Sequence, residues 1–491
     1  MVSGESNQLA SKDCRVCNRR RIRCDRTVPS CLKCATKGVA CPGYGPRYRW
    51  ANAAAIRGKF KGLGTPDSFQ AAGSPENNKD GIVFPQRTPE EPLLVQSNQS
   101  KSSLDTLAPS LPEHIAKRLL DHYATSIAPI MVWLDSDKNA YRRLVIPLAE
   151  KHPSLRLSLL AISAAHMHHE LELDATFSQS AGQTAILMIT ERVRQMIETP
   201  NGQQNEQQEK DNREIEALLA AMLTLSNHSL LGSELSHAQS HRQAARILIN
   251  TLTLRGPSDD ELIVFLKNQL ATYDILACTT LFSHHHIQHA IMPPVEQNVL
   301  FGNFLIILHR ITTWSLQEVP DSLAPNYPSL SELEEEFELA RGLTLLAAGP
   351  LMTTSSSQCS QLEFVRLVQM YHHAGMLYAC KRLRVSNLVA FDQVEKAHSA
   401  KLFRLLEHFK HADAPWHNLP WPIFIAGISS GGDQGRKCTV TDLCQMLSAS
   451  TRFEHYTDLS AFLQELWQSS HGDWCLLARE WERRGNPIIA I

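Results

Sequence analysis

The segment Cys14–Cys41 reads CRVCNRRRIRCDRTVPSCLKCATKGVAC and holds six of the twelve cysteines of this 491-residue chain. The six repeat the spacing C-x2-C-x6-C, and each cysteine of the second half follows its counterpart by 17 positions: Cys14, Cys17, Cys24, and then Cys31, Cys34, Cys41. The first residues of the chain are polar, with no apolar leader, so we expect a reducing compartment. There, thiolate ligation of a metal is favoured over disulfides.

The repeat predicts a particular ligand count. Two tetrahedral Zn²⁺ ions need eight bonds and six thiolates supply six, so two sulfur atoms would have to bridge both ions. A single ion in a four-cysteine ribbon or treble clef, with two spare thiols, is the alternative. That alternative leaves the internal repeat unexplained.

The two halves share their spacing but not their charge. Between the second and third cysteines the first half has NRRRIR, whereas the second has ATKGVA. The sequence predicts a short helix from Cys17 on which Arg19, Arg20 and Arg21 fan over about 200°, a spread that suits a DNA groove. Arginine pairs bidentately with guanine, so Arg20 and Arg21 are candidate base readers, with Arg19 and Arg23 on phosphates. A solvated helix face or a nuclear import signal is the alternative interpretation.

Basic character continues after the sixth cysteine. Residues 42–61 include Arg47 and Arg49 next to Tyr48 and Trp50, without an acidic residue. Residues 11–61 carry a formal charge of +12, and the rest of the chain carries −14. We expect 42–61 to be an arm that follows DNA, although such a stretch could equally pack on a larger domain.

In its cysteine spacing and its basic residues, the segment Cys14–Cys41 resembles the Zn2Cys6 binuclear cluster of fungal transcription factors. The six cysteines, the basic run, Asp25 after the third cysteine and Pro29 between the halves all match, whereas Asn18 stands where relatives commonly have arginine. The resemblance implies that two of the cysteines bridge the ions, Cys14 and Cys31. It implies that Cys17 and Cys24 complete one zinc site and Cys34 and Cys41 the other. It also places Arg21 at the position that reads a CGG triplet.

The rest of the chain divides by composition. We expect residues 1–13 to be a disordered N-terminus. Residues 62–110 are rich in Pro, Gly, Ser, Asn and Gln, a composition that predicts a flexible linker, and they contain no heptad repeat. Residues 111–491 predict an all-α domain. Stretches such as WPIFIAG resemble the regulatory region of the acriflavine-resistance-regulator-like subgroup of the same factors. The fold class is thus a small Zn2Cys6 domain at 14–41, its arm at 42–61, and a large all-α regulatory domain.

Apolar periodicity predicts helices throughout 111–491. Ser258 and Glu261 have the spacing of a capping box, which predicts a helix start there. The polar insert Pro200–Asn212 predicts a disordered loop. The remaining predicted helices are 113–127, a run that opens at Pro153, 179–197, 213–231, 236–252, 361–383, 391–409 and 458–468. The six scattered cysteines are expected to be buried free thiols: Cys278, Cys359, Cys380, Cys438, Cys444 and Cys475.

Signs of an enzyme are weak in this region. No nucleophile elbow, Walker loop or dinucleotide fingerprint occurs, and the glycine-rich Gly427–Gly435 lacks the P-loop lysine. Two histidine groups, His166 to His169 and His284 to His289, lack the H-E-x-x-H order, so polar helix ends are the favoured interpretation. The acidic run that begins at Ser331 predicts a solvated amphipathic helix, with an activation surface as the alternative.

We therefore expect a nuclear, sequence-specific DNA-binding regulator of RNA polymerase II promoters, not an enzyme, with two Zn²⁺ per chain. Its partners would be CGG-type double-stranded DNA and the transcription machinery, and no apolar run is long enough for a membrane span. Residues 1–70 would bind one site as a monomer, with any homodimer formed through the helical domain. The resemblance also implies service to a secondary-metabolite gene cluster. A helical scaffold or sensor with a purely structural zinc cluster is the competing hypothesis.

Overall fold

The computed structural model describes residues 13–14, 16–17, 20–27, 31–37, 39, 41, 111–167, 176–198, 205–254, 260–294, 299–316, 328–352, 358–383, 389–409, 416–469 and 472–491. The chain divides into two units, Met1–Ser97 and Asn98–Ile491. Arg19, Arg47, Arg49, Pro29, the arm and the linker lie outside the described residues, so the predictions made for them stay predictions.

The small unit is built around the cysteines rather than around a core of aliphatic side chains. Its described helical residues are Val16 and Cys17 in the first half and helix α2, Leu32–Ala35, which begins directly after Cys31. The buried side chains here are cysteines, and Val16 and Ile22 pack against them. A unit this small needs a metal to be stable.

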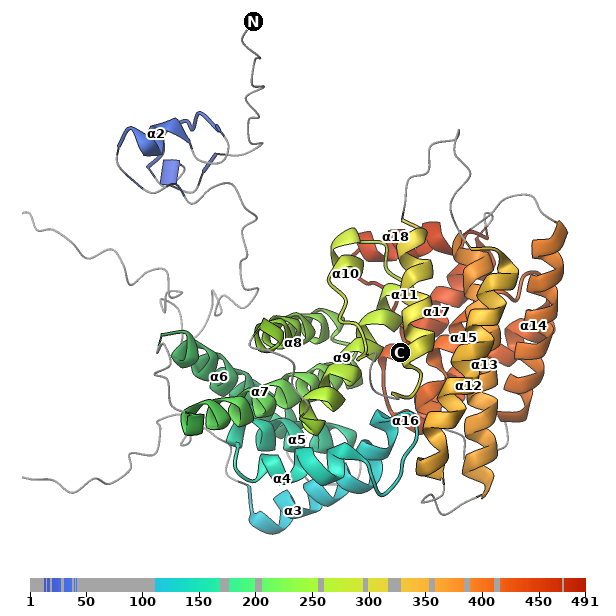
Figure 1. Cartoon of the computed structure of the whole chain (residues 1–491), viewed down its shortest axis with the longest axis horizontal. Coiled ribbons are helices and arrows are strands. Elements are labelled where there is room, and N and C mark those ends of the chain that lie inside the picture. Colours follow the sequence, from blue (N-terminus) through green and yellow to red (C-terminus); the bar gives the residue numbers. More distant parts are fainter. Residues whose placement is uncertain are drawn as a thin grey trace, which may run out of the picture. The chain divides into compact units, whose positions relative to one another are not determined.

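The large unit begins with helices that form one side of a bundle (Figure 1). Helix α5 contacts α3, α6 and α7, while α7 also contacts α8 and α9. Their bounds are α3 Glu113–His122, α4 Ile146–Ala149, α5 Pro153–His166, α6 Thr176–Glu198, α7 Asn205–Leu231, α8 Leu235–Leu254 and α9 Glu261–Cys278. Short turns join α3 to α4: π-helical η2 Tyr123–Ile127, 3-10 η3 Ala128–Met131 and π-helical η4 Tyr141–Val145.

The second part of the large unit centres on α12, α13 and α14, which lie side by side, α13 in contact with both neighbours (Figure 1). Helix α15 contacts α13, α14, α16 and α17. The bounds are α10 His284–Gln288, α11 Gly302–Trp314, α12 Leu330–Met352, α13 Gln358–Leu383, α14 Val389–Phe409, η5 Trp416–Asn418, α15 Pro420–Ile428, α16 Gln434–Thr451, α17 His455–Gln468 and α18 Trp474–Arg483. No strand occurs in the described part of this unit, so the predicted all-α fold is confirmed.

Large aromatic side chains connect the two parts through one continuous core. Trp133, from the loop after η3, stacks on Phe301 before α11 with ring centroids 4.1 Å apart. Tyr371 of α13 stacks on Trp421 of α15 at 5.4 Å. The indole Nε1 of Trp421 donates to Thr279 Oγ1 at 3.0 Å, so this buried polar atom is satisfied.

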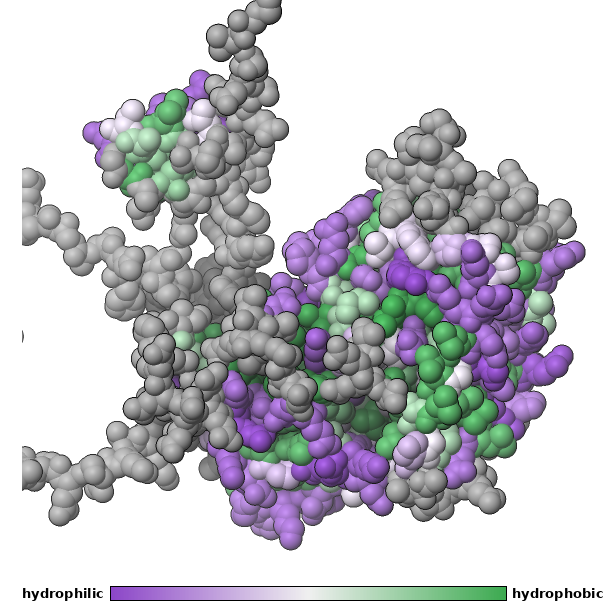
Figure 2. Space-filling model, in the orientation of Figure 1, coloured by the Kyte–Doolittle hydropathy of each residue, from purple (hydrophilic) through white to green (hydrophobic). Residues whose placement is uncertain are grey.

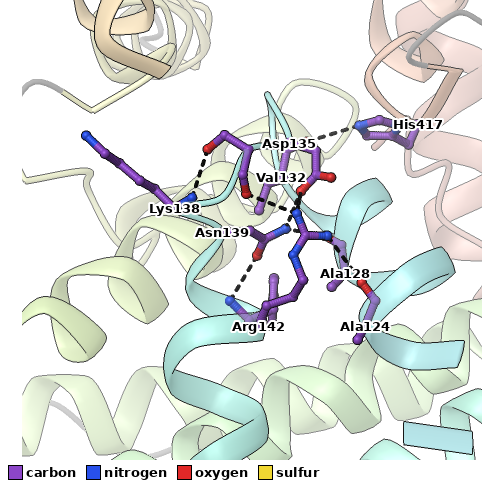
Figure 3. A network of polar contacts seen from close by, with 10 residues as sticks. Ala124, Ala128, Val132, Asp135, Lys138, Asn139, Arg142 and His417 are labelled. Carbon is purple, nitrogen blue, oxygen red and sulfur yellow. Dashed lines mark hydrogen bonds and ion pairs between the residues drawn. The ribbon is translucent and has the colours of Figure 1, made fainter. Parts of the chain in front are cut away.

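A polar network holds the irregular segment between η3 and η4 (Figure 3). Asn139 Nδ2 and Arg142 Nη2 both donate to Asp135 Oδ1, at 2.8 and 2.6 Å. From η5, the Nε2 atom of His417 lies 3.0 Å from the carbonyl oxygen of Val132. These bonds fasten a loop near the start of the helical unit to a turn near its end.

The predicted helices largely agree with the structure, and the differences have local causes. Helix α7 already begins at Asn205, so the predicted disordered loop is wrong for its second part. The cap of α9 is Asp260, whose carboxylate accepts the amide of Leu262 at 2.9 Å, rather than Ser258, which lies outside the described residues. Four of the scattered cysteines are buried as expected, but Cys438 is exposed.

The acidic run forms the first turns of α12. Leu333 and Phe337 are fully buried, which agrees with the amphipathic helix predicted there. Further along the helix, Leu339 and Leu346 are 64% and 75% exposed, and Leu343 lies between them. Figure 2 shows this apolar patch over α12 on an otherwise mostly polar face.

Candidate metal centre and nucleic-acid interface

The six cysteines of the repeat converge on one small volume. Cys14, Cys17, Cys24, Cys31 and Cys34 are buried, and Cys41 is partly exposed. Sulfur atoms of different cysteines lie close together: Cys14 to Cys31 at 3.5 Å, Cys14 to Cys34 at 3.7 Å, Cys17 to Cys31 at 3.7 Å and Cys41 to Cys31 at 3.8 Å. Zn–S bonds of about 2.3 Å in a tetrahedron give S–S edges of about 3.8 Å, so these spacings fit zinc.

The thiols fall into two groups of four that share two members. One group is Cys14, Cys17, Cys24 and Cys31, and the other is Cys14, Cys31, Cys34 and Cys41. Within each group all sulfur atoms lie within 4.8 Å of one another. Two tetrahedra with a shared edge have this arrangement, and the shared edge here is Cys14–Cys31, in agreement with the bond count for a binuclear cluster.

Burial also affects the protons of these thiols. It raises the pKa of Cys17, Cys31 and Cys34 to about 12 in the absence of metal, while neighbouring thiols act in both directions. Since zinc binds the thiolate, loading the cluster releases protons. The affinity of this unit for zinc is therefore expected to rise with pH.

The 17-residue repeat is visible in the backbone hydrogen bonds. The amide of Ile22 donates to the carbonyl of Cys17 at 3.1 Å, and the amide of Val39 donates to that of Cys34 at 3.1 Å. Each bond spans five residues, as in the Schellman motif that ends a helix. The two halves thus stop their helical turns in the same way.

The helix expected to carry three arginines is shorter than predicted. The first helical turn includes Val16 and Cys17, and Arg21 adopts a left-handed backbone with φ 53° that ends it. Arg21 therefore does not lie on a helix surface, and the predicted fan of three arginines over one helix is wrong. In the second half the residue 17 positions later is Gly38, the residue type that this backbone conformation favours.

Two carboxylates organise the chain around the cysteines. Asp25 accepts the amides of Leu32 and Lys33, each at 2.9 Å, at the start of α2. A hydrogen bond from Thr27 and these amides hold the pKa of Asp25 well below its usual range. The carboxylate therefore ties the first half of the repeat to the helix of the second half, which explains its place after the third cysteine.

Asp13 also holds the chain in place around the cysteines. Its Oδ1 accepts Arg26 Nε at 2.6 Å, and this bond is the main reason for its lowered pKa. Arg26 is therefore engaged within the unit. By contrast, Arg20, Arg21 and Arg23 are exposed, and no hydrogen bond or ion pair joins their guanidinium groups to another described residue. These three cations are available to a polyanion.

Of the histidines singled out from the sequence, His168 and His169 lie outside the described residues, and the described ones do not assemble a metal site. His166 lies against His122, with Nδ1 and Nε2 3.0 Å apart, and His285 stacks on His289 at a centroid distance of 4.4 Å. A different group, His372, His373 and His398, was missed. His372 and His373 are adjacent on α13, and only the pairing of α13 with α14 brings His398 next to them.

A short unit that can hold two metal ions and presents free arginines, followed by a large helical unit, is the architecture of a zinc-cluster transcription regulator. Comparison with known proteins gives the same class. Residues 12–51 match the fungal Zn(2)-Cys(6) binuclear cluster domain, and residues 118–482 match the fungal specific transcription factor domain. The chain therefore belongs to the fungal-specific transcription factors with an N-terminal zinc cluster, and its cofactor is zinc, two ions per cluster.

One characterised relative is the acriflavine sensitivity control protein acr-2 of Neurospora crassa. It is 25% identical over 357 residues, an alignment that covers 56% of this chain and 58% of the relative, so the match spans less than two thirds of that protein. No solved structure is significantly similar to the chain. Among the described helices, none is both long and apolar enough to cross a membrane.

Proposed function

We propose that this protein is a nuclear transcription factor that binds CGG-type sites in RNA polymerase II promoters and acts without catalysing a reaction. The observation that carries the proposal is the exposure of Arg20, Arg21 and Arg23 on the first half of the cluster, without partners among the described residues. Acidic residues near a DNA-facing surface would weaken binding, and the two of the cluster, Asp13 and Asp25, are both engaged elsewhere.

In this proposal the six cysteines hold two zinc ions, with Cys14 and Cys31 as bridging ligands. Cys17 and Cys24 complete one site, while Cys34 and Cys41 complete the other, which agrees with the two groups of sulfur atoms. The ions fold the unit and fix its backbone. The protein itself then presents the cations that bind DNA.

The arginines divide by role. We propose that Arg20 and Arg21 read the O6 and N7 atoms of guanine. Arg21 lies in the turn that ends the first helical segment, and Arg20 directly precedes it in the sequence. Arg23 would hold a phosphate, as would Arg19, Arg47 and Arg49, which lie outside the described residues. Base contacts would give specificity and phosphate contacts would give most of the affinity.

A monomeric cluster reads about three base pairs, which is little information for promoter choice. We propose that any homodimer forms through the helical unit, since the chain has no heptads between cluster and helices. The exposed leucines of α12, Leu339, Leu343 and Leu346, support this proposal because they lie on one helix face.

Chromatin immunoprecipitation in the native host tests the function directly. We expect enriched fragments to carry CGG triplets upstream of genes whose transcripts change when the chain is deleted. A chain with Arg20→Ala and Arg21→Gly serves as the matched control and should lose the enrichment. Equal recovery of fragments by both chains would contradict direct DNA reading and favour a scaffold role.

The targets themselves are a finer proposal that rests on the subgroup resemblance. We propose that the regulated genes form a contiguous secondary-metabolite cluster. Transcript profiling of the deletion strain should then show coordinated changes in neighbouring genes. Changes scattered over single, unlinked genes would contradict this assignment.

A further inference from the structure

Three histidines gather between α13 and α14, in the helical unit and away from the zinc cluster in sequence. They are His372 and His373 on α13 and His398 on α14, with one ring nitrogen of each within 4.8 Å of the others. His373 Nδ1 lies 3.1 Å from His398 Nδ1. Tetrahedral Zn–N bonds of about 2.0–2.1 Å give N–N edges of about 3.3 Å, so the two nitrogens are spaced as ligands of one ion.

Carboxylates of the neighbouring helix α12 face the outer sides of these rings. Glu334 Oε1 lies 3.5 Å from His398 Nε2, and Glu338 Oε2 lies 3.7 Å from His372 Nδ1. The Nδ1 of His398 faces His373 while its Nε2 faces a carboxylate. Metal-binding histidines commonly have this arrangement, in which the carboxylate orients the ring and makes it a better donor.

Two of the three rings are buried within the helical unit. His372 and His398 are 5% and 3% exposed. The Nδ1 atom of His372 is the one that faces Glu338, so a metal shared with the other two rings would be bound by its Nε2. In the absence of metal, the Nδ1 atoms of His373 and His398 share a hydrogen bond, which an ion would replace.

The site is also accessible. His372 and His373 line an open cavity of about 690 Å³ together with Glu334, Glu335 and Glu338. Two cations also line it, Arg341 and Lys401, of which Arg341 is paired with Glu338. The acidic groups outnumber the basic ones, so the cavity admits a divalent cation.

We propose that His372, His373 and His398 form a third metal site, for Zn²⁺ or a similar divalent first-row ion, that joins α13 to α14. Imidazole nitrogen is a ligand that zinc, copper and nickel accept, whereas Ca²⁺ and Mg²⁺ prefer oxygen. The site is separate from the thiolate cluster and does not depend on DNA binding. Occupancy would cross-link two adjacent helices of the regulatory region.

Zinc counting on the full-length protein tests this proposal. After saturation with Zn²⁺ and removal of loosely bound metal, we expect three zinc ions per wild-type chain. His373→Asn with His398→Asn should lower the count to two, whereas Cys14→Ser with Cys31→Ser should leave one. His285→Asn with His289→Asn, which alters the other histidine group, is the matched control and should keep three.

A second readout separates loss of the site from loss of the fold. Added Zn²⁺ should raise the thermal unfolding temperature of the helical unit in the wild type and in the Cys14→Ser, Cys31→Ser chain. The His373→Asn, His398→Asn chain should have the helical content of the wild type but no such rise. Two zinc ions in the wild type, or an unchanged count in the His373→Asn, His398→Asn chain, would overturn the proposal.

Discussion

Arg21 has a strained backbone conformation that its side chain does not require. Its left-handed φ of 53° ends the first helical turn, a conformation that costs free energy for any residue with a Cβ. Glycine stands at the equivalent position of the second half. The first half therefore keeps an arginine where the fold alone would favour glycine, which points to a role for the guanidinium group.

This conformation supplies a substitution that removes the side chain without harming the turn. Arg21→Gly should weaken binding to a CGG duplex by about 1–3 kcal/mol and change binding to a scrambled duplex little. Arg23→Ala should instead weaken both and lower the dependence of log K on log salt by about one. Anisotropy titrations at several salt concentrations measure both effects, and an equal loss on the two duplexes for Arg21→Gly would rule out base reading.

Glu216 gives a test at a single residue of the helical unit. Its side chain is 3% exposed, its Oε2 accepts Arg213 Nη1 at 3.0 Å, and burial together with Asp260 raises its pKa to about 7. At pH values between the pKa of Glu216 in the unfolded chain and about 7, the carboxyl group is protonated in the folded state and ionised in the unfolded state. Stability therefore falls as the pH rises through this window.

Relative to the wild type, Glu216→Gln should gain stability as the pH increases from 5 to 8, by about 1–2 kcal/mol after allowance for solvent screening. Denaturant unfolding at each pH gives the two free energies of unfolding. Parallel curves for the two chains over this range would show that Glu216 does not titrate there.

At the scale of elements, α12 and α13 approach each other at a glycine. A Cβ added to Gly375 of α13 would lie 2.5 Å from Cε1 of the buried Phe337 of α12. The ring is enclosed on all sides and cannot move away cheaply. The glycine thus permits the helix contact that also brings His372 and His373 close to the carboxylates of α12.

Gly375→Ala should destabilise the helical unit by about 1–3 kcal/mol, although alanine has the higher helix propensity. Gly342→Ala on α12 is the matched control, because no atom lies within 4 Å of its added Cβ. That change should be neutral or stabilise by about 0.5–1 kcal/mol. Calorimetric unfolding compares the two, and a stable Gly375→Ala chain would refute the close contact.

A comparison of the predicted with the observed helices shows which features local sequence patterns predict. Periodicity located α5, α6, α8, α13, α14 and α17, and thiol spacing predicted the binuclear cluster, since both are local patterns. Helix α15 was missed because its nine residues are all buried and have no polar face to reveal a helical period. The left-handed Arg21 was missed because it depends on a backbone bond from Ile22 to Cys17. The histidine group depends on how two helices pair, which no local pattern records.

For the whole molecule, the exposed leucines of α12 bear on assembly. An apolar row of Leu339, Leu343 and Leu346 on the surface is costly unless another surface covers it. Leu339→Lys with Leu346→Lys should lower self-association of the full-length chain and leave its folding and its affinity for one CGG site intact. Sedimentation over a range of concentrations measures this, and unchanged association would place any dimer contact elsewhere.

The proposed function requires that the first half of the zinc cluster reads DNA. Its most direct test is the equilibrium affinity of the zinc-loaded full-length protein for a CGG duplex and for a scrambled duplex at one salt concentration. We expect a preference of at least about tenfold, since each mismatched pair costs about 1–3 kcal/mol. The preference should vanish on chelation of zinc and in Arg20→Ala, and persist in Lys37→Ala, the equivalent position of the second half. Equal affinity for the two duplexes would contradict the account.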